Sequence, residues 1–270
     1  MMDLRGKNVV VTGGSYGIGK EIARSFLAEG ANVFVVARGE DGLRACEEEL
    51  RAEFPAGRIK GYRADVGNSE EIAATMDEIA EGEGGIQVLV NNAGIVIPGY
   101  FQELPVDAFE KVVRTNYLGA VYATKAALPH LLENRESAVA FTSSPAGIKG
   151  LFGYSTYSPT KAALIALAEV IRAELRDKGV RVCVLCPPDT DTPGFREEAK
   201  VRPRETEAIA GSSPPRSPRE VAECFMRGFK KGRFLILCDL NSRLLYRLNG
   251  LSPRLVDLIL DRMASKGKRT

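Results

Sequence analysis

The sequence predicts a doubly wound α/β fold, in which one open parallel sheet of about seven strands carries helices on both faces. Short apolar runs rich in valine alternate with longer segments of helical periodicity along most of the chain. The first run leads directly into a glycine-rich turn and a helical pattern, an order typical of phosphate-binding folds. With 270 residues, 44% of them hydrophobic, the chain is long enough for one large core. We therefore expect a single domain, because the Pro/Gly clusters fall at strand ends and no linker interrupts the alternation.

Strands are expected where short apolar runs end at a glycine, a proline or a polar residue. In chain order they span residues 8–12, 32–37, 58–63, 86–90, 138–143, 180–185 and 234–238. Helical patterns occupy residues 41–54, 69–79, 109–132, 157–176 and 218–228, and another follows Gly19 directly. Ser69 is the expected N-cap of one helix, Gly119 interrupts the long one, and Gly179 ends another.

Composition and charge exclude several functional classes. Lys and Arg number 37 against 35 Asp and Glu, and the net charge of +2 argues against a nucleic-acid-binding protein. The chain starts without an apolar h-region and contains no run of about 18 apolar residues, so neither a signal peptide nor a transmembrane helix is expected. These features predict a cytoplasmic protein.

The five cysteines are expected to be free thiols in a reducing compartment, because a chain of this length does not need disulfides for stability. Cys183 and Cys186 form a C-x-x-C pattern, but they lie in an apolar run that indicates a buried strand. Because side chains alternate between the faces of a strand, the two thiols point apart. We therefore favour packing over redox or metal chemistry, and no metal site is expected.

The glycine-rich turn after the first strand is a candidate phosphate site. Its spacing is Gly-x-x-x-Gly-x-Gly, formed by Gly13, Gly17 and Gly19. Glycines let the backbone approach a pyrophosphate, and the following helix offers free N–H groups at its start. A purely structural turn is the alternative.

Two charged residues at strand ends bear on the choice of cofactor. Arg38 ends the second strand, where an acid would bind the ribose 2′-hydroxyl of NAD and an arginine accommodates the 2′-phosphate of NADP. We therefore favour NADP, with a solvated surface arginine as the alternative. Asp65 follows the third strand at the carboxyl edge of the sheet, where ligands bind in such folds.

Tyr157 and Lys161 are candidates for acid–base chemistry. Four residues apart in a helical pattern, they lie on one face of a helix. A phenol ordinarily titrates near pH 10, and a neighbouring ammonium lowers that value. Such a tyrosine exchanges a proton with an alcohol or carbonyl oxygen. Asn116, in the middle of a helical pattern, needs a polar partner, whereas the single histidine, His130, is expected at the surface or in packing.

Taken together, these motifs resemble the short-chain dehydrogenase/reductase family over nearly the whole chain. The matching residues, in the order and spacing of the family, are Thr12, Gly13, Gly17, Gly19, residues 91–94, Asn116, Ser144, Tyr157 and Lys161. The resemblance implies a Rossmann-type fold in which Tyr157 donates or accepts the proton and Ser144 holds the substrate oxygen. It also implies that Lys161 lowers the pKa of Tyr157 and binds the nicotinamide ribose, while Asn116 anchors a water-linked proton relay. Ser143 adjoins Ser144 and stays open as an alternative for the catalytic serine.

The same resemblance implies an NADPH site and an oligomer. Its cofactor contacts are expected at Gly13, Ser15, Tyr16, Gly17, Ile18, Gly19, Arg38, Asp65, Val66, Asn92, Ala93, Gly94, Tyr157, Lys161, Pro187, Thr190 and Thr192. Family members pair through the two long helices around Asn116 and Tyr157, so a homodimer or homotetramer is expected by analogy.

Within the family, residues 187–195 depart from the common Pro-Gly pattern after the sixth strand. This segment, together with residues 13–17, 150–154 and 200–206, is similar to the members that reduce the 3-keto group of 3-ketodihydrosphingosine with NADPH. An apolar channel for the lipid tail is expected from residues 95–101 and 151–152, from Phe195 and from the segment beyond it. The alternatives are a reductase of another lipid-like ketone, such as a steroid or a β-ketoacyl thioester, and an NADP-binding regulator without catalysis.

The end of the chain differs in character from the rest. A catalytic domain is expected over residues 1–240, with a substrate lid at about residues 195–218 rising from the carboxyl edge of the sheet. Residues 241–270 combine helically spaced leucines with arginines and lysines, which predicts an amphipathic, basic helical extension. This extension either contacts the cytoplasmic face of a membrane as a peripheral helix or packs on the domain or on a second subunit.

Overall fold

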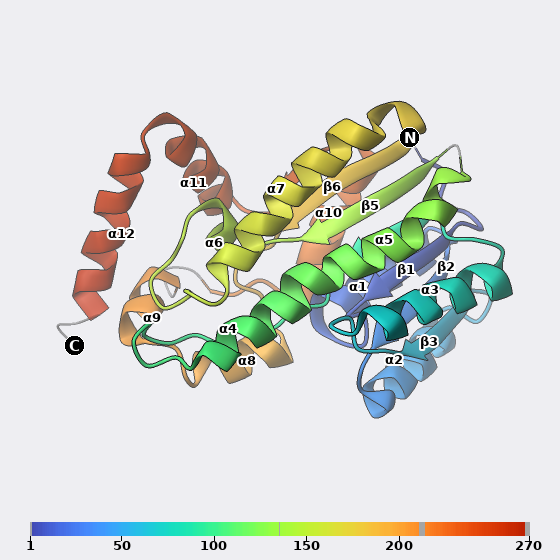
Figure 1. The fold of residues 1–270 in the computed structure, drawn as a ribbon, viewed down its shortest axis with the longest axis horizontal. Helices are drawn as coiled ribbons and strands as arrows, with labels where there is room; N and C mark the ends of the chain where they lie inside the picture. The colour runs from blue at the N-terminus through green and yellow to red at the C-terminus, as the bar shows by residue number, and fades with distance from the viewer. Residues whose placement is uncertain (1, 135, 211–213, 268–270) are drawn as a thin grey trace.

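The valine-rich runs of the sequence form a single seven-stranded sheet in the computed structural model, which describes residues 2–134, 136–210 and 214–267 (Figure 1). The strand order is β3-β2-β1-β4-β5-β6-β7, and every neighbouring pair is parallel. The strands are β1 (Asn8–Thr12), β2 (Asn32–Ala37), β3 (Ile59–Arg63), β4 (Val88–Asn91), β5 (Ser137–Thr142), β6 (Val180–Cys186) and β7 (Leu235–Leu237). The predicted fold class is confirmed, and the strand limits lie within two residues of the expected ones.

Helices cover both faces of this sheet. One face packs against α1 (Gly17–Ala28), α2 (Glu40–Glu53) and α10 (Pro218–Lys230), and the other against α3 (Ser69–Glu83), α5 (Gly119–Leu132) and α7 (Ser158–Leu175). The remaining helices are α4 (Val106–Val113), the π-helix η1 (Arg114–Leu118), α6 (Pro145–Ile148), the 3-10 helix η2 (Arg176–Lys178), α8 (Pro193–Ala199), α9 (Arg204–Ala210), α11 (Leu240–Leu251) and α12 (Pro253–Gly267). Apolar side chains fill both layers because each strand of a parallel sheet is buried on its two faces.

Some helix limits differ from the expected ones. Asn68, not Ser69, caps α3, since its side chain accepts hydrogen bonds from the backbone N–H of Glu70 and Glu71. The long helix expected to break at Gly119 is continuous from α4 through η1 into α5. Gly119 instead permits close packing, because a Cβ atom there would lie 2.9 Å from Cγ2 of Val66.

The cysteines follow the expectation only in part. Cys224 of α10 and Cys238, directly after β7, form a disulfide with their Cα atoms 5.6 Å apart, so the prediction that all five are free thiols is wrong for this pair. The chain turns back after α10 and packs β7 against that helix, which brings the two residues together. Cys183 and Cys186 are buried free thiols on opposite faces of the sheet, which confirms their packing role.

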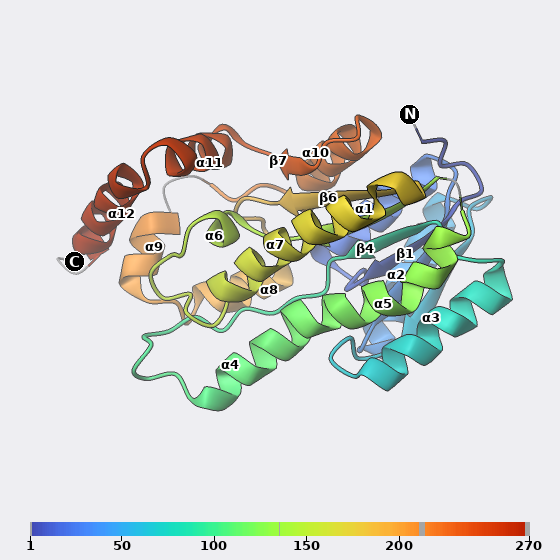
Figure 2. The ribbon, with the colours of Figure 1, turned by 45° about the horizontal axis from the view of Figure 1, so that its top comes forward.

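Figures 1 and 2 show α8, α9, α11 and α12 gathered beyond one end of the sheet. The expected lid region therefore contains two short helices, and the expected C-terminal helix is two helices separated at Ser252. Asn249 of α11 donates a hydrogen bond to the carbonyl of Ile148, and Asp257 of α12 forms an ion pair with Lys149. Among the residues that the structure describes, no helix has the length and apolarity needed to cross a bilayer.

Candidate active site

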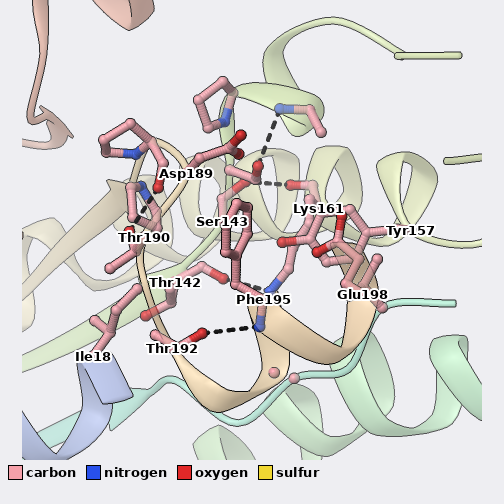
Figure 3. A pocket seen from close by; sticks show the side chains of 18 of the residues that line it. Ile18, Thr142, Ser143, Tyr157, Lys161, Asp189, Thr190, Thr192, Phe195 and Glu198 are labelled. Carbon is pink, nitrogen blue, oxygen red and sulfur yellow. Dashed lines mark hydrogen bonds between the residues drawn. The ribbon is translucent and has the colours of Figure 1, made fainter. Parts of the chain in front are cut away.

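A cavity of about 2140 Å³ opens at the carboxyl ends of the strands, between the sheet and the helices gathered there. Parallel α/β sheets bind ligands at this edge, outside the ends of the strands. The turn after β1, the ends of β2, β4, β5 and β6, and parts of α7, α8, α11 and α12 contribute to its lining. Figure 3 shows the part of this wall where Tyr157, Lys161 and Glu198 lie together.

The glycine-rich turn lies against the loop that follows β4. Gly13 has φ +64°, and a Cβ atom there would lie 2.7 Å from Cα of Ala93. The hydroxyl of Thr12 accepts hydrogen bonds from the N–H groups of Asn92 and Ala93, and the Asn92 amide donates to the carbonyl of Gly13. These contacts leave a bare backbone surface at the start of α1, whose first turn carries no acidic side chain. The arrangement fits a pyrophosphate, which needs close backbone approach and no competing carboxylate.

Most of the expected cofactor residues line this cavity. They are Gly13, Ser15, Tyr16, Gly17, Ile18, Arg38, Val66, Asn92, Ala93, Gly94, Tyr157, Lys161, Pro187, Thr190 and Thr192. Gly19 and Asp65 are not part of the lining. Gly19 packs under the turn instead, because a Cβ atom there would collide with Gly13 and Asn92.

Arg38 and Asp65 meet at the rim of the cavity. Nη1 of Arg38 lies 3.9 Å from Oδ2 of Asp65, and both side chains are about half exposed. Asp65 also accepts a hydrogen bond from the N–H of Gly67 through its other oxygen, Oδ1. Arg38 is therefore only loosely paired with Asp65, and it lines the cavity.

The candidate proton donor and its lysine lie at the start of α7, as their spacing predicts. Nζ of Lys161 donates a 2.8 Å hydrogen bond to the carbonyl of Thr142 and lies 5.4 Å from the centroid of the Tyr157 ring. Burial lowers the pKa of Lys161 to about 8. Burial also raises the pKa of Tyr157 above its ordinary value, and the charge of Glu198 raises it further. The expected lowering of the pKa of Tyr157 by Lys161 is therefore wrong as a net effect, because desolvation outweighs every favourable contact of the phenol.

The structure distinguishes the two adjacent serines. The hydroxyl of Ser143 is buried and donates a 2.7 Å hydrogen bond to the carbonyl of Lys161, which commits it to the backbone. The hydroxyl of Ser144 accepts a hydrogen bond from the N–H of Ala146 and makes the hydrogen bond that acts to lower the pKa of Tyr157. Ser144 is thus the serine that faces the phenol.

Asn116 lies below the cavity wall and does not line it. Its side chain is fully buried in η1, accepts a hydrogen bond from the N–H of Ile95 and donates to the Ile95 carbonyl and to the hydroxyl of Thr160. These are the partners that a buried amide requires. They connect the loop after β4 to α7, which carries Tyr157 and Lys161. Asn116 therefore holds two parts of the site together, whereas the water-linked relay stays a prediction.

Several residues of the site are absent from the sequence-based prediction. Glu198 of α8 has a side chain only 10% exposed and accepts a hydrogen bond from the hydroxyl of Tyr154. Asp189, after β6, lines the same wall, and burial raises the pKa of both carboxyls. In the sequence, Glu198 lies in a run of charged residues, a pattern typical of a solvent-exposed segment. Its position shortly after Thr192, an expected cofactor contact, was the only feature of the sequence that placed it near the site.

The apolar wall of the cavity comes largely from the end of the chain. The lining side chains of α11 and α12 include Leu244, Leu245, Leu248, Val256, Ile259, Leu260 and Met263. Of the expected channel residues, Ile95, Val96, Ile97, Pro98, Leu151 and Phe195 line the cavity. Phe152 packs edge-on against Tyr100 and Phe101 is 71% exposed, so neither contributes to the lining.

Comparison with known proteins agrees with this geometry. The family model described as short chain dehydrogenase matches residues 7–202. The chain is 39% identical over 267 residues to a 3-ketodihydrosphingosine reductase of Dictyostelium discoideum, covering 93% of this chain and 80% of the relative. It is also 39% identical over 256 residues to a 3-dehydrosphinganine reductase of Danio rerio, covering 93% of this chain and 77% of the relative.

Two solved structures share the fold. A short chain dehydrogenase/reductase from Burkholderia phymatum in complex with NAD superposes with a TM-score of 0.84 at 26% identity, covering 94% of this chain and 96% of the other. The L-sorbose reductase of Gluconobacter frateurii, complexed with NADPH and L-sorbose, gives 0.74 at 26% identity, covering 84% of this chain and 91% of the other. Family model, relatives, topology and site agree, and the chain belongs to the short-chain dehydrogenase/reductase family.

Proposed function

We propose that this protein reduces the 3-keto group of 3-ketodihydrosphingosine to the alcohol with NADPH. The observation that carries the proposal is a single cavity in which Tyr157, Ser144 and Lys161 lie at one end of a wall of leucine, isoleucine and methionine side chains. Such a wall suits a long alkyl tail, because burying apolar surface is favourable in proportion to its area. The relatives named for this reaction, at 38–39% identity over most of the chain, support the same substrate.

Each residue of the site has a separate role in the proposed proton transfer. The nicotinamide, when bound, supplies a hydride to the keto carbon. Tyr157 donates its phenolic proton to the ketone oxygen as negative charge develops there, and Ser144 holds that oxygen by a hydrogen bond. Lys161 is protonated below its pKa of about 8 and presents a positive charge beside the phenol, which stabilises the phenolate formed in the reaction. Asn116 positions the loop and the helix that carry these groups.

NADPH is the proposed cofactor rather than NADH. The free donors of Arg38 at the cavity rim would bind the 2′-phosphate, and Asp65, 3.9 Å away, is too weakly paired to occupy them. The bare turn at Gly13 and Gly17 would receive the pyrophosphate, and the Lys161 ammonium would reach the nicotinamide ribose. The two structural neighbours carry NAD in one case and NADPH in the other, so the fold itself accepts either cofactor.

A β-ketoacyl thioester is the second candidate substrate, because a relative named ketoacyl reductase HetN, from Nostoc, is 31% identical over 265 residues. A carrier-bound thioester would need a basic docking patch near the cavity. The basic residues expected to form such a patch are Lys200, Arg202 and Arg204. The Arg202 side chain is buried and Lys200 is paired with Glu197, whereas Arg204 is exposed. These contacts favour the free lipid ketone over the carrier-bound thioester. A steroid substrate would leave the alkyl-lined wall without a function. A regulatory role without catalysis would leave the assembled proton-transfer groups without a function.

The proposal extends to a cytoplasmic protein that touches the membrane from which its substrate comes. Exposed apolar residues not used by the cavity remain on α11 and α12, among them Leu251, Leu255 and Leu258. Flotation of the full chain with anionic vesicles, compared with a variant carrying Leu251→Ser and Leu258→Ser, tests this contact. Equal flotation of the two proteins would contradict the membrane contact. The expected homodimer or homotetramer, formed through the α5 and α7 helices, stays a prediction.

The reduction itself is tested by following the loss of NADPH absorbance with 3-ketodihydrosphingosine in detergent micelles. Turnover, with dihydrosphingosine identified by mass spectrometry, is the expected result. A protein that binds NADPH but reduces only β-ketoacyl thioesters or steroids would overturn the proposed substrate and leave the cofactor proposal standing.

A further inference from the structure

The cavity wall around Tyr157 contains more carboxylates than cations. Glu198 reaches it from α8 and Asp189 from the segment after β6, and both line the cavity (Figure 3). The Glu198 side chain is nine-tenths buried, which is unusual for a carboxylate whose ion-pair partner, Arg202, lies as far as 3.9 Å away.

Glu198 lies one side chain away from the phenol of Tyr157. The hydroxyl of Tyr154 donates a hydrogen bond to Oε1 of Glu198, and the Tyr154 ring packs edge-on against the Tyr157 ring with 5.7 Å between centroids. The charges of Glu198 and Asp189 both act on the Tyr157 phenol. The two carboxylates therefore line the same cavity as the phenol that would face the ketone oxygen.

The guanidinium of Arg202 lies among the acidic side chains at this wall. Nε of Arg202 lies 2.5 Å from Oε2 of Glu207, while Nη1 lies 3.9 Å from Oε1 of Glu198. Within the described residues, the Asp189 carboxylate has no hydrogen bond or ion pair of its own, although Arg202 and Glu207 act on it through their charges. Asp189, Glu198 and Glu207 thus interact with the one guanidinium of Arg202, and the Lys161 ammonium in the same wall forms no ion pair with any of them within the described residues. The protein therefore neutralises the carboxylates of this wall only in part. Burying such charge is costly unless a cation joins it.

We propose that Asp189 and Glu198 form a subsite for the ammonium group that the substrate carries on the carbon next to its ketone. This inference rests on the proposed function and deepens it, because 3-ketodihydrosphingosine is an amine whereas steroids and β-ketoacyl thioesters carry no cation at that position. The ammonium donates charge-assisted hydrogen bonds to the two carboxylates while Tyr157 faces the neighbouring carbonyl oxygen. The subsite makes substrate choice depend on charge as well as on the apolar tail.

The test compares two short-chain soluble ketones that differ only in the amino group, with NADPH at neutral pH. Wild-type protein is expected to prefer the amino ketone in kcat/KM by about 10- to 100-fold, the range of a charge-assisted hydrogen bond. Glu198→Gln and Asp189→Asn are each expected to lose most of this preference through a higher KM for the amino ketone, with kcat/KM for the neutral ketone changed by less than about threefold.

Asp191→Asn is the matched control. Its carboxylate lies two residues from Asp189 but is held by Arg196 and is not part of the cavity lining, so the preference should persist. If Glu198→Gln lowers the activity on both ketones equally, Glu198 only supports Tyr154 and the subsite is overturned.

A binding measurement separates this inference from the proposed reduction. Calorimetric titration of the NADP-loaded protein with a short-chain amino diol, compared with the diol that lacks the amino group, requires no turnover. Tighter binding of the amine, weakened by Glu198→Gln, supports the subsite even where no ketone is reduced. Equal affinity for the two diols overturns the subsite even where reduction proceeds.

Discussion

Lys161 places its ammonium 5.4 Å from the centroid of the Tyr157 ring and donates a hydrogen bond to the backbone carbonyl of Thr142. Within the described residues the ammonium forms no ion pair with a carboxylate, and burial lowers its pKa to about 8. The same charge that would stabilise a phenolate in the reaction therefore costs stability in the folded protein.

Replacement of this lysine should stabilise the protein while it abolishes turnover. The folded-state pKa of about 8 lies below the ordinary lysine value of 10.5, so below pH 8 the folded state carries the full cost of a buried charge. We expect Lys161→Met to raise the free energy of unfolding at pH 7 by about 2 kcal/mol, measured by urea denaturation.

The pH dependence provides the control for that variant. Between pH 8 and 10.5 the unfolded state binds more protons than the folded state, so the wild-type protein gains stability relative to Lys161→Met as pH rises. A difference between the two proteins that stays constant from pH 7 to pH 10 would contradict the buried charge.

Loss of the phenolic hydroxyl should remove the chemistry and keep the binding. Tyr157→Phe preserves the ring that packs on Tyr154 but has no proton to donate, so kcat should fall by about 10²- to 10⁴-fold. NADPH affinity, measured by fluorescence, should change little. Tyr246→Phe, on the exposed side of α11, is the control, and retained turnover in Tyr157→Phe would assign the proton to another group.

Arg38 should set the cofactor preference. Removing its guanidinium eliminates the charge-assisted hydrogen bonds proposed for the 2′-phosphate, so Arg38→Ala should lower kcat/KM for NADPH by about 10- to 100-fold. The value for NADH should change little. Arg44→Ala, an exposed arginine paired with Glu40 on α2, serves as the control. An equal loss with both cofactors would assign Arg38 a structural role.

Two glycines should respond to alanine with opposite signs. A Cβ atom at Gly19 would collide with backbone atoms of the turn at Gly13, so Gly19→Ala should destabilise the protein by about 1–3 kcal/mol and weaken NADPH binding. Gly82 lies in α3 with nothing within 4 Å of its Cβ position. Gly82→Ala should therefore stabilise the protein by about 0.5–1 kcal/mol in thermal unfolding. Similar effects at both positions would contradict the close packing of the turn.

The disulfide between Cys224 and Cys238 should contribute to stability. The chain-entropy model gives about 3 kcal/mol for a loop of about 15 residues, and the two cysteines are separated by 14 positions. Denaturant unfolding of wild type and of the Cys224→Ser/Cys238→Ser variant, each with and without reductant, measures this contribution. Wild-type stability that does not respond to reductant would contradict a formed disulfide.

The strands could be predicted because their signal is local. A run such as residues 8–12 is β-branched, short and buried on both faces, and it forms the strand that its composition indicates. The π-helix at Asn116 had no such signal. Its residues continue a helical pattern, and the accompanying hydrogen bonds to Ile95 and Thr160 join segments far apart in the chain.

The sequence was sufficient to predict which residues form the site, but not the burial and the charges that surround them. The spacing of Tyr157 and Lys161 correctly indicated that they lie together on one helix. It could not indicate that burial and Glu198 would raise the pKa of the phenol, since Glu198 comes from a different helix. The choice between Ser143 and Ser144 likewise depended on which hydroxyl the Lys161 carbonyl engages.

The contact between α12 and α9 bears on how fast a ligand leaves. Gly267 lies so close to the backbone of Arg204 and Glu205 that a Cβ atom there would come within 2.7 Å of the Arg204 carbonyl oxygen. The end of α12 thus packs closely against α9, beside the cavity that both helices help to line. We expect a product with a long alkyl tail to leave the cavity only when α12 and α9 separate. Product release, rather than hydride transfer, would then limit turnover for the longest tails.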